Sequence, residues 1–243
     1  MFDPTLIKFP RAHSIREIEI NLESYLTSNN NLIIVFEDWI TQLNVKYHQH
    51  RIDIFLNDQI QFNPCVFVSL TEETFTDNQI TAHINFISAQ HDCDMPSTQA
   101  GTWLIRMVDA LVYALGCSIA QLYDGSQIEC PNSSVFVSLI FLRIFAGRFS
   151  SWYENFGFQT QDKAELVQLM QELYHLPIAN FTSDVLEDYS PLQNETLGSY
   201  MNRLWQMNCH AYDQMFKDLA RQTPLIDQIV DLNLNEYSKR YYP

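Results

Sequence analysis

The sequence predicts an α/β (α+β) protein: a mixed, mostly antiparallel sheet flanked by helices, followed by a helical C-terminal extension. Two observations predict this fold. In the first third of the chain, a helical stripe is followed by short apolar or alternating runs bounded by turn residues, a pattern typical of antiparallel strands. After residue 100, apolar residues recur mainly at helical spacing. We place a boundary near residue 160, between an α/β domain (1–160) and the extension (161–243).

The first elements follow from local patterns. Apolar residues at 15, 18, 22 and 26 form one stripe and predict a helix over Ile15–Leu26. The segment Leu32–Leu43 begins with a β-rich run and is compatible with either a strand or a buried helix. The strands expected next are Ile52–Leu56 and Ile60–Phe62, as a hairpin around Asn57-Asp58, then Cys65–Leu70 and Ile80–Ser88.

Glycine marks the ends of elements in the middle of the chain. Five of the six glycines lie between residues 101 and 157, where they indicate tightly specified backbone geometry. The elements expected from here on are a helix over 101–115 ended by Gly116, a strand over Ile119–Tyr123, a turn at Asp124-Gly125, a helix over Val135–Ala146 stopped by Gly147, and the helices Ala164–His175 and Leu197–Leu219, the last broken by Thr223-Pro224.

Charge and composition exclude several classes of function. Lys and Arg number 14 against 29 Asp and Glu, a formal net charge of −15 that repels polyphosphates. We therefore expect no nucleic-acid binding, which needs clustered basic residues. No apolar run approaches the roughly 18–20 residues of a membrane span, so no membrane insertion is expected.

The cysteines and the N-terminus indicate a cytoplasmic protein. The five cysteines form no CxxC pair, which favours reduced thiols over a disulfide framework. The start, Met1-Phe-Asp-Pro4, lacks the basic and apolar regions of a signal peptide. His91-Asp-Cys-Asp94 has metal-capable atoms but no second cluster with ligand spacing, so we expect a solvated loop and no metal site.

Two segments carry a resemblance to a known family. Leu122-Tyr-Asp-Gly-Ser126 follows the predicted helix 101–115, and Ser151-Trp-Tyr-Glu-Asn-Phe-Gly-Phe158 closes the region. Together with the element order, they resemble the second half of the Gcn5-related N-acetyltransferase (GNAT) fold, closest to the acetyltransferase-like proteins of large DNA viruses. The resemblance covers Ile80–Phe158. It implies a GNAT-like sheet with acetyl-coenzyme A between two diverging strands, its pyrophosphate held by N–H groups at a helix N-terminus.

The cofactor loop implied by the resemblance departs from the family pattern. It reads Thr98-Gln99-Ala100-Gly101-Thr102-Trp103, and Gly101 matches the first glycine of the pattern. Thr98 stands where the family has Gln or Arg, and the bulky Trp103 stands where a small residue lets the phosphates approach. His91-Asp-Cys-Asp94 adds two carboxylates nearby. These departures disfavour binding of acetyl-coenzyme A.

The resemblance also implies catalytic positions. Tyr153 aligns with the tyrosine that protonates the departing thiolate in many GNAT enzymes, a role that suits a phenol of pKa about 10. The alternative is that Tyr153 is a core aromatic. His83 is the one titratable candidate for a general base on the predicted strands that would face the cleft. A hydrogen-bonded structural histidine is the commoner role at such a position.

Two functions of different class follow. One is a non-catalytic GNAT-like protein-interaction module without a cofactor. It would act as an adaptor, a secretion-system component or an effector of an intracellular pathogen, because its acidic, Asn- and Gln-rich composition is similar to that of such proteins. Its partner-binding face would be the stripe with Trp205, Met207 and Met215, because Met and aromatic side chains adapt to irregular surfaces; core packing is the alternative. The other is an active acetyltransferase that uses acetyl-coenzyme A on an amine or cationic protein. We favour the first, a pseudoenzyme.

Overall fold

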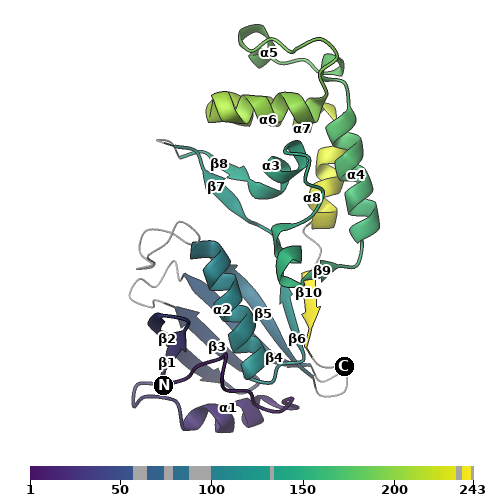
Figure 1. The fold of residues 1–243 in the computed structure, drawn as a ribbon. Helices are drawn as coiled ribbons and strands as arrows, with labels where there is room; N and C mark the ends of the chain where they lie inside the picture. The colour runs from purple at the N-terminus through teal and green to yellow at the C-terminus, as the bar shows by residue number, and fades with distance from the viewer. Residues whose placement is uncertain (57–64, 74–78, 88–99, 132–133, 234–236, 242–243) are drawn as a thin grey trace. The chain divides into compact units, whose positions relative to one another are not determined.

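The computed structural model describes residues 1–56, 65–73, 79–87, 100–131, 134–233 and 237–241. The chain divides into two compact units, Met1–Leu122 with Ser238–Pro243, and Tyr123–Tyr237 (Figure 1). The boundary expected near residue 160 therefore lies inside the second unit. Among the described helices, none combines the length and the apolar character of a membrane span.

The first unit is built on a mixed sheet in which β1 to β6 are neighbours in sequence order and β10 follows β6. β1 to β5 are antiparallel to one another in turn, and β6 runs parallel to β5. This confirms the predicted α/β class with a mostly antiparallel sheet. The strands are β1 (Asn31–Phe36), β2 (Trp39–His48), β3 (Arg51–Leu56), β4 (Val66–Glu73), β5 (Gln79–Ile87), β6 (Ile119–Leu122) and β10 (Tyr237–Arg240).

The described part of the first unit also contains the helices α1 and α2. Helix α1 (Ile15–Glu23) buries the predicted stripe of Ile15, Ile18 and Leu22. Helix α2 (Ala100–Ala114) lies across the sheet (Figure 1) and contacts β5. It is followed by Gly116 at φ 80°, where a Cβ atom would lie 2.2 Å from the Pro10 carbonyl oxygen. Only glycine fits this position, which confirms the predicted helix end.

The ambiguous segment Leu32–Leu43 contains most of a hairpin rather than one element. Its residues divide between β1 and β2, which pair around a turn containing Glu37, a residue with positive φ. Alternating burial in β1 gives the strand its period of two. The predicted strand Ile60–Phe62 and its turn lie outside the described residues, and the observed antiparallel partner of β3 on that side is β4.

The second unit is mostly helical, with a short hairpin. Its helices pack around a hydrophobic core, and the hairpin strands pair antiparallel. The elements are β7 (Gln127–Glu129), β8 (Phe136–Ser138), α3 (Leu139–Phe145), the 3₁₀ helix η1 (Trp152–Phe156), β9 (Gln159–Thr160), α4 (Lys163–His175), the 3₁₀ helix η2 (Ile178–Asn180), α5 (Val185–Asp188), α6 (Leu197–Met207), α7 (Cys209–Gln222) and α8 (Leu225–Asn233).

Two predicted helices of this unit are corrected. The helix expected over Val135–Ala146 begins only at Leu139, because Phe136–Ser138 pair with β7 as a strand. The helix expected over Leu197–Leu219 is two helices, separated at Asn208. The Asn208 side chain accepts hydrogen bonds from the N–H groups of His210 and Ala211, so it caps α7 and ends α6.

Gly198 of α6 provides a test of the packing of α4 against α6. A Cβ atom at Gly198 would lie 1.9 Å from Cδ2 of Tyr174 on α4. Gly198→Ala should lower the free energy of unfolding by roughly 1–3 kcal/mol through overpacking, even though alanine favours helix by about 1 kcal/mol. Chemical denaturation measures the change.

Gly125→Ala is the matched control, because a Cβ atom there would meet no atom within 4 Å. We expect it to change stability by no more than about 0.5 kcal/mol. A Gly198→Ala variant as stable as the control would contradict the close contact of Tyr174 with α6.

Candidate functional site

Asp124 connects the two segments that carry the family resemblance. Ser126 donates its hydroxyl to the Asp124 carboxylate, and Ser151 donates its hydroxyl to Oδ2 at 2.9 Å. The Ser126 N–H also donates to Oδ1 at 3.3 Å, so the Asp124 side chain closes the predicted turn. The Asp124 carbonyl accepts from Asn233 at 3.0 Å. The carboxylate is thus engaged as a buried acceptor.

Tyr153, the predicted general acid, lies in η1 directly beyond this carboxylate. Ser151 caps η1: its hydroxyl accepts from the Tyr153 N–H at 3.2 Å, and Glu154 accepts from the Ser151 N–H. The ring is 8% exposed and packs edge-on against Phe158. Burial, and then the charge of Asp124, raise the pKa of Tyr153 above its usual value. The phenol stays protonated and is a weaker acid than a free tyrosine.

His83, the predicted general base, lies on β5 of the first unit. Its Nε2 is 2.9 Å from Thr71 Oγ1, and the strand register pairs it with Ser69 on one side and Gln121 on the other. His83 therefore belongs to a polar row across three strands. Tyr153 lies in the second unit, so the structure does not bring the predicted acid and base together within one unit.

The predicted cofactor loop is described only from its glycine onward. Thr98 and Gln99 lie outside the described residues. Gly101 and Thr102 are in the first turn of α2 and are partly buried.

Trp103 is fixed by several contacts. Its indole N–H donates to Oε2 of Glu37 at 3.1 Å, and its ring lies edge-on to Phe36 and Trp39, with centroids 4.9 Å and 4.5 Å away. The other oxygen of Glu37 pairs with Arg106 at 2.7 Å. The turn between β1 and β2 therefore brings both an aromatic wall and a carboxylate to the first turns of α2.

The predicted partner-binding residues are not on one face. Met215 is fully buried in the core of the second unit, which corrects its assignment to a surface. Trp205 is partly buried and packs edge-on against Tyr212, with centroids 5.5 Å apart. Met207 is 60% exposed at the end of α6, where its sulfur lies 3.9 Å from the Arg203 guanidinium. Of the three residues, Met207 is the one available to a partner.

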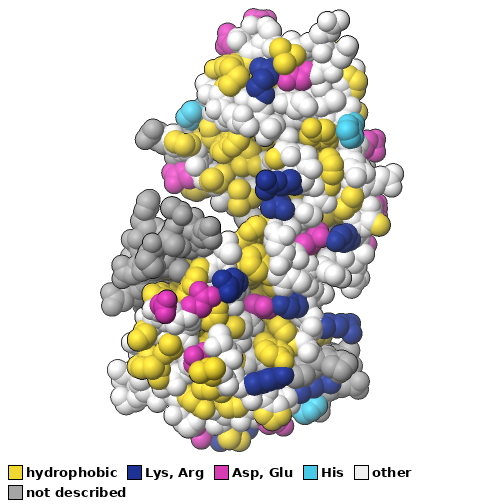
Figure 2. Space-filling model, in the orientation of Figure 1, with side chains coloured by type: hydrophobic (Ala, Val, Ile, Leu, Met, Phe, Trp, Pro, Cys, Tyr) yellow, Lys and Arg dark blue, Asp and Glu magenta, His cyan; other side chains and the backbone are white. Residues whose placement is uncertain are grey.

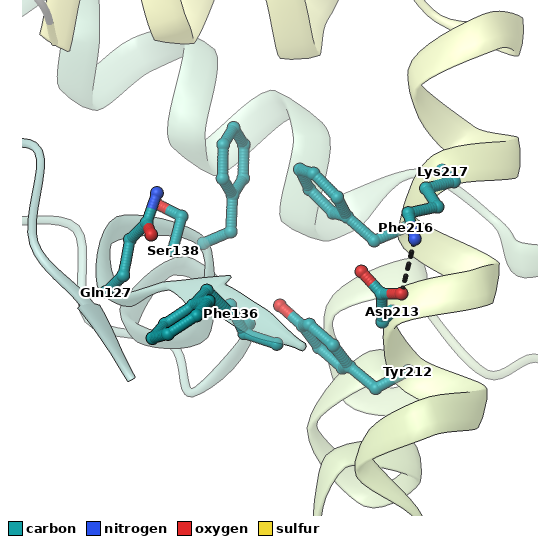
Figure 3. Close-up of a pocket in the computed structure, with 9 residues that line it drawn as sticks. Gln127, Phe136, Ser138, Tyr212, Asp213, Phe216 and Lys217 are labelled. Atoms are coloured by element: carbon teal, nitrogen blue, oxygen red, sulfur yellow. Dashed lines mark hydrogen bonds and ion pairs between the residues drawn. The ribbon is translucent and has the colours of Figure 1, made fainter. Parts of the chain in front are cut away.

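A pocket of about 270 Å³ opens within the second unit, between the β7–β8 hairpin, α3 and α7 (Figure 3). Hydrophobic side chains gather over this part of the unit on the face shown in Figure 2. The lining residues are Gln127, Phe136, Val137, Ser138, Phe141, Tyr212, Asp213, Phe216 and Lys217. The sequence did not predict this pocket. One sequence signal relates to it: Asn208 is a polar residue in an apolar stripe. It marks the helix break at which α7, one wall of the pocket, begins.

A disulfide joins two walls of the pocket. Cys130, directly after β7, is bonded to Cys209, the first residue of α7, with Cα atoms 5.9 Å apart. Cys65 is disulfide-bonded as well, whereas Cys117 is free and buried. The expectation of reduced thiols is therefore corrected. Sequence spacing could not reveal the bond between Cys130 and Cys209, because these cysteines are 79 residues apart.

No group of three or more His, Cys, Asp or Glu side chains within the described residues is arranged to hold a metal ion. Comparison with protein-family models and with curated proteins finds no match for this chain. What the residues around Tyr153 and those lining the pocket can do is therefore argued from their own geometry.

The disulfide generates a stability prediction. The double variant Cys130→Ser with Cys209→Ser should lower the free energy of unfolding by about 2–4 kcal/mol, because the bond restricts a long loop of the unfolded chain. Chemical denaturation of the oxidised proteins measures the loss.

Cys117→Ala is the control, since it removes a buried thiol without touching the cross-link. Alkylation followed by peptide mass mapping, on protein purified without reductant, checks the bond directly. Labelling of both Cys130 and Cys209 would contradict it.

Proposed function

We propose that this chain is a non-catalytic, GNAT-like protein-interaction module, a pseudoenzyme that acts as an adaptor, a secretion-system component or an effector of an intracellular pathogen. The observation that carries the proposal is the anchoring of Trp103. The resemblance requires a small residue at this position for the phosphates of acetyl-coenzyme A to approach. Here the indole is held by Glu37 and two aromatic rings.

The predicted catalytic residues support the same proposal. A general acid for a thiolate should have a pKa near that of the leaving group. Burial raises the pKa of Tyr153 above the ordinary value of a phenol, so its proton is harder to transfer. His83 lies within hydrogen-bond distance of Thr71 in the polar row of the sheet. Both residues have structural contacts that account for their presence.

The alternative is an active acetyl-coenzyme A-dependent N-acetyltransferase on an amine or cationic protein. One observation favours it: β5 and β6 are neighbouring parallel strands connected through α2, the helix at whose N-terminus the resemblance implies the pyrophosphate site. The net charge of −15 would attract a cationic acceptor.

The proposed partner surface lies at the end of α6. Met207 and Leu192 are both more than half exposed. Arg203, which contacts the Met207 sulfur, pairs with Glu195 at 2.8 Å, and Glu195 also accepts from the Leu192 N–H. Two exposed apolar side chains thus flank a fixed ion pair. Arg and Met are enriched in protein interfaces.

A cytoplasmic location remains a prediction. Structural disulfides are rare in reducing compartments. The bond between Cys130 and Cys209 therefore favours a compartment, or a stage of the protein's life, that is oxidising. The peptide mapping described above, carried out on protein from its native cell, decides between a reducing and an oxidising location.

Calorimetric titration with acetyl-coenzyme A tests the loss of catalysis. We expect no heat of binding up to millimolar cofactor, because the indole of Trp103 stands where the resemblance needs a small residue for the phosphates to approach. Binding with a micromolar dissociation constant would overturn the proposal and favour the enzyme.

Trp103→Gly sharpens the test. If the indole alone blocks the loop, this variant should bind the cofactor at least about tenfold more tightly than the native chain, a change of about 1.4 kcal/mol. Thr102→Gly is the matched control, because it loosens the same helical turn and keeps the indole. No gain with Trp103→Gly means that the pocket itself is absent.

Co-purification from native cells tests the interaction. Met207→Asp should reduce the recovery of a specific partner by about tenfold, the effect of removing one central apolar contact. Quantitative mass spectrometry measures the recovery. Leu6→Asp is the control, since Leu6 is an exposed side chain of the first unit. Equal recovery with both variants would exclude this surface.

A further inference from the structure

The Tyr212 hydroxyl in the wall of the pocket has no hydrogen-bond partner among the described residues, although it is fully buried. An unpaired buried hydroxyl destabilises a protein by about 1–3 kcal/mol, so such groups are rare. Other buried tyrosines of the unit are paired: Tyr200 donates to the Tyr189 carbonyl at 2.9 Å, and Tyr237 donates to Asn233 at 3.0 Å. Of the four buried side-chain atoms without a partner among the described residues, which belong to Tyr47, Asp53, Thr160 and Tyr212, only the Tyr212 hydroxyl belongs to a residue that lines this pocket.

The other lining groups define the chemistry of a partner for this hydroxyl. Phe136, Phe141 and Phe216 line the pocket with aromatic rings. Figure 3 shows the Tyr212 phenol extending from α7 into the space beside Phe136 and Phe216. The two charged residues of the lining, Asp213 and Lys217, neutralise each other at 2.7 Å. The pocket therefore offers flat apolar walls and no unpaired charge, which suits a neutral aromatic ring.

Tyr212 would act as a donor in this pocket. Burial, and then the neighbouring charge of Asp213, raise its pKa well above the ordinary value, so the phenol keeps its proton throughout the physiological range. The volume also fits: a cavity of about 150 Å³ is enough for benzene. At about 270 Å³, this pocket has room for a ring with a substituent.

We propose that the pocket binds a small, neutral aromatic molecule with a hydrogen-bond acceptor such as a carbonyl group. Its ring lies among the three phenylalanines, and its acceptor atom accepts a hydrogen bond from the Tyr212 hydroxyl. The disulfide between Cys130 and Cys209 holds the hairpin and α7 at the spacing that the ring requires.

Two probes of nearly equal shape test the proposal on the native chain. Acetophenone carries a carbonyl oxygen where α-methylstyrene carries a methylene group. Protein-observed NMR titration should show both binding, with shifts at Phe136, Phe141 and Phe216, and acetophenone about 3- to 10-fold more tightly, the effect of one added hydrogen bond.

Tyr212→Phe isolates the hydroxyl. This variant should bind the two probes equally and, without a probe, should melt at the same or a higher temperature than the native chain, because it removes an unpaired polar group. Tyr200→Phe is the matched control. It should melt at a lower temperature, because it loses a hydrogen bond, and it should keep the preference for acetophenone.

Ser138→Leu is a second, independent variant. Ser138 lines the pocket, and its side chain makes no cap hydrogen bond with α3. A leucine there should fill the cavity and abolish binding of both probes. Absence of binding of either probe to the native chain at millimolar concentration overturns the proposal. So does equal affinity for the two probes, or a preference that survives Tyr212→Phe.

Discussion

A buried carboxylate joins the beginning and the end of the second unit. Asp124 accepts the hydroxyls of Ser126 and Ser151 through its side chain, and its carbonyl accepts from Asn233 in the last turn of α8. A charge with these donors is stable in the interior, whereas one stripped of its partners is strongly destabilising. Through Ser151 the same carboxylate orients η1. The pKa of Tyr153 in η1 is raised by the burial of its ring and then by the charge of Asp124.

Periodicity in the sequence was enough to predict the fold class and most elements. Stripes of Ile and Leu predicted α1 and α2, and glycines with positive φ ended helices where expected, at Gly116 and Gly147. Errors arose where a single side chain overrides periodicity. Asn208 caps a new helix although the apolar stripe continues past it. Phe136–Ser138 become a strand because β7 offers a partner, a fact that local sequence does not contain.

The candidate sites were less predictable than the fold. The motifs drew attention to the segments that contain Asp124 and Ser151, but nothing in the sequence predicted that the two side chains share one hydrogen bond. The pocket could not be predicted, because Phe141 and Phe216 follow the same helical spacing as core residues. The pocket is distinguished by the Tyr212 hydroxyl, which has no hydrogen-bond partner among the described residues. Hydrogen-bond partners depend on which residues are neighbours in three dimensions, and the local sequence does not contain this information. The disulfide escaped prediction for the same reason.

The bond between Cys130 and Cys209 turns the chain between them into a covalent ring that contains α3, α4, α5 and α6. A protease that cuts any loop of this ring opens it without releasing a fragment. The exposed loop around Leu192 lies within the ring. A molecule nicked there keeps its full mass under oxidising conditions and separates into two pieces only after its sulfur bridge is reduced.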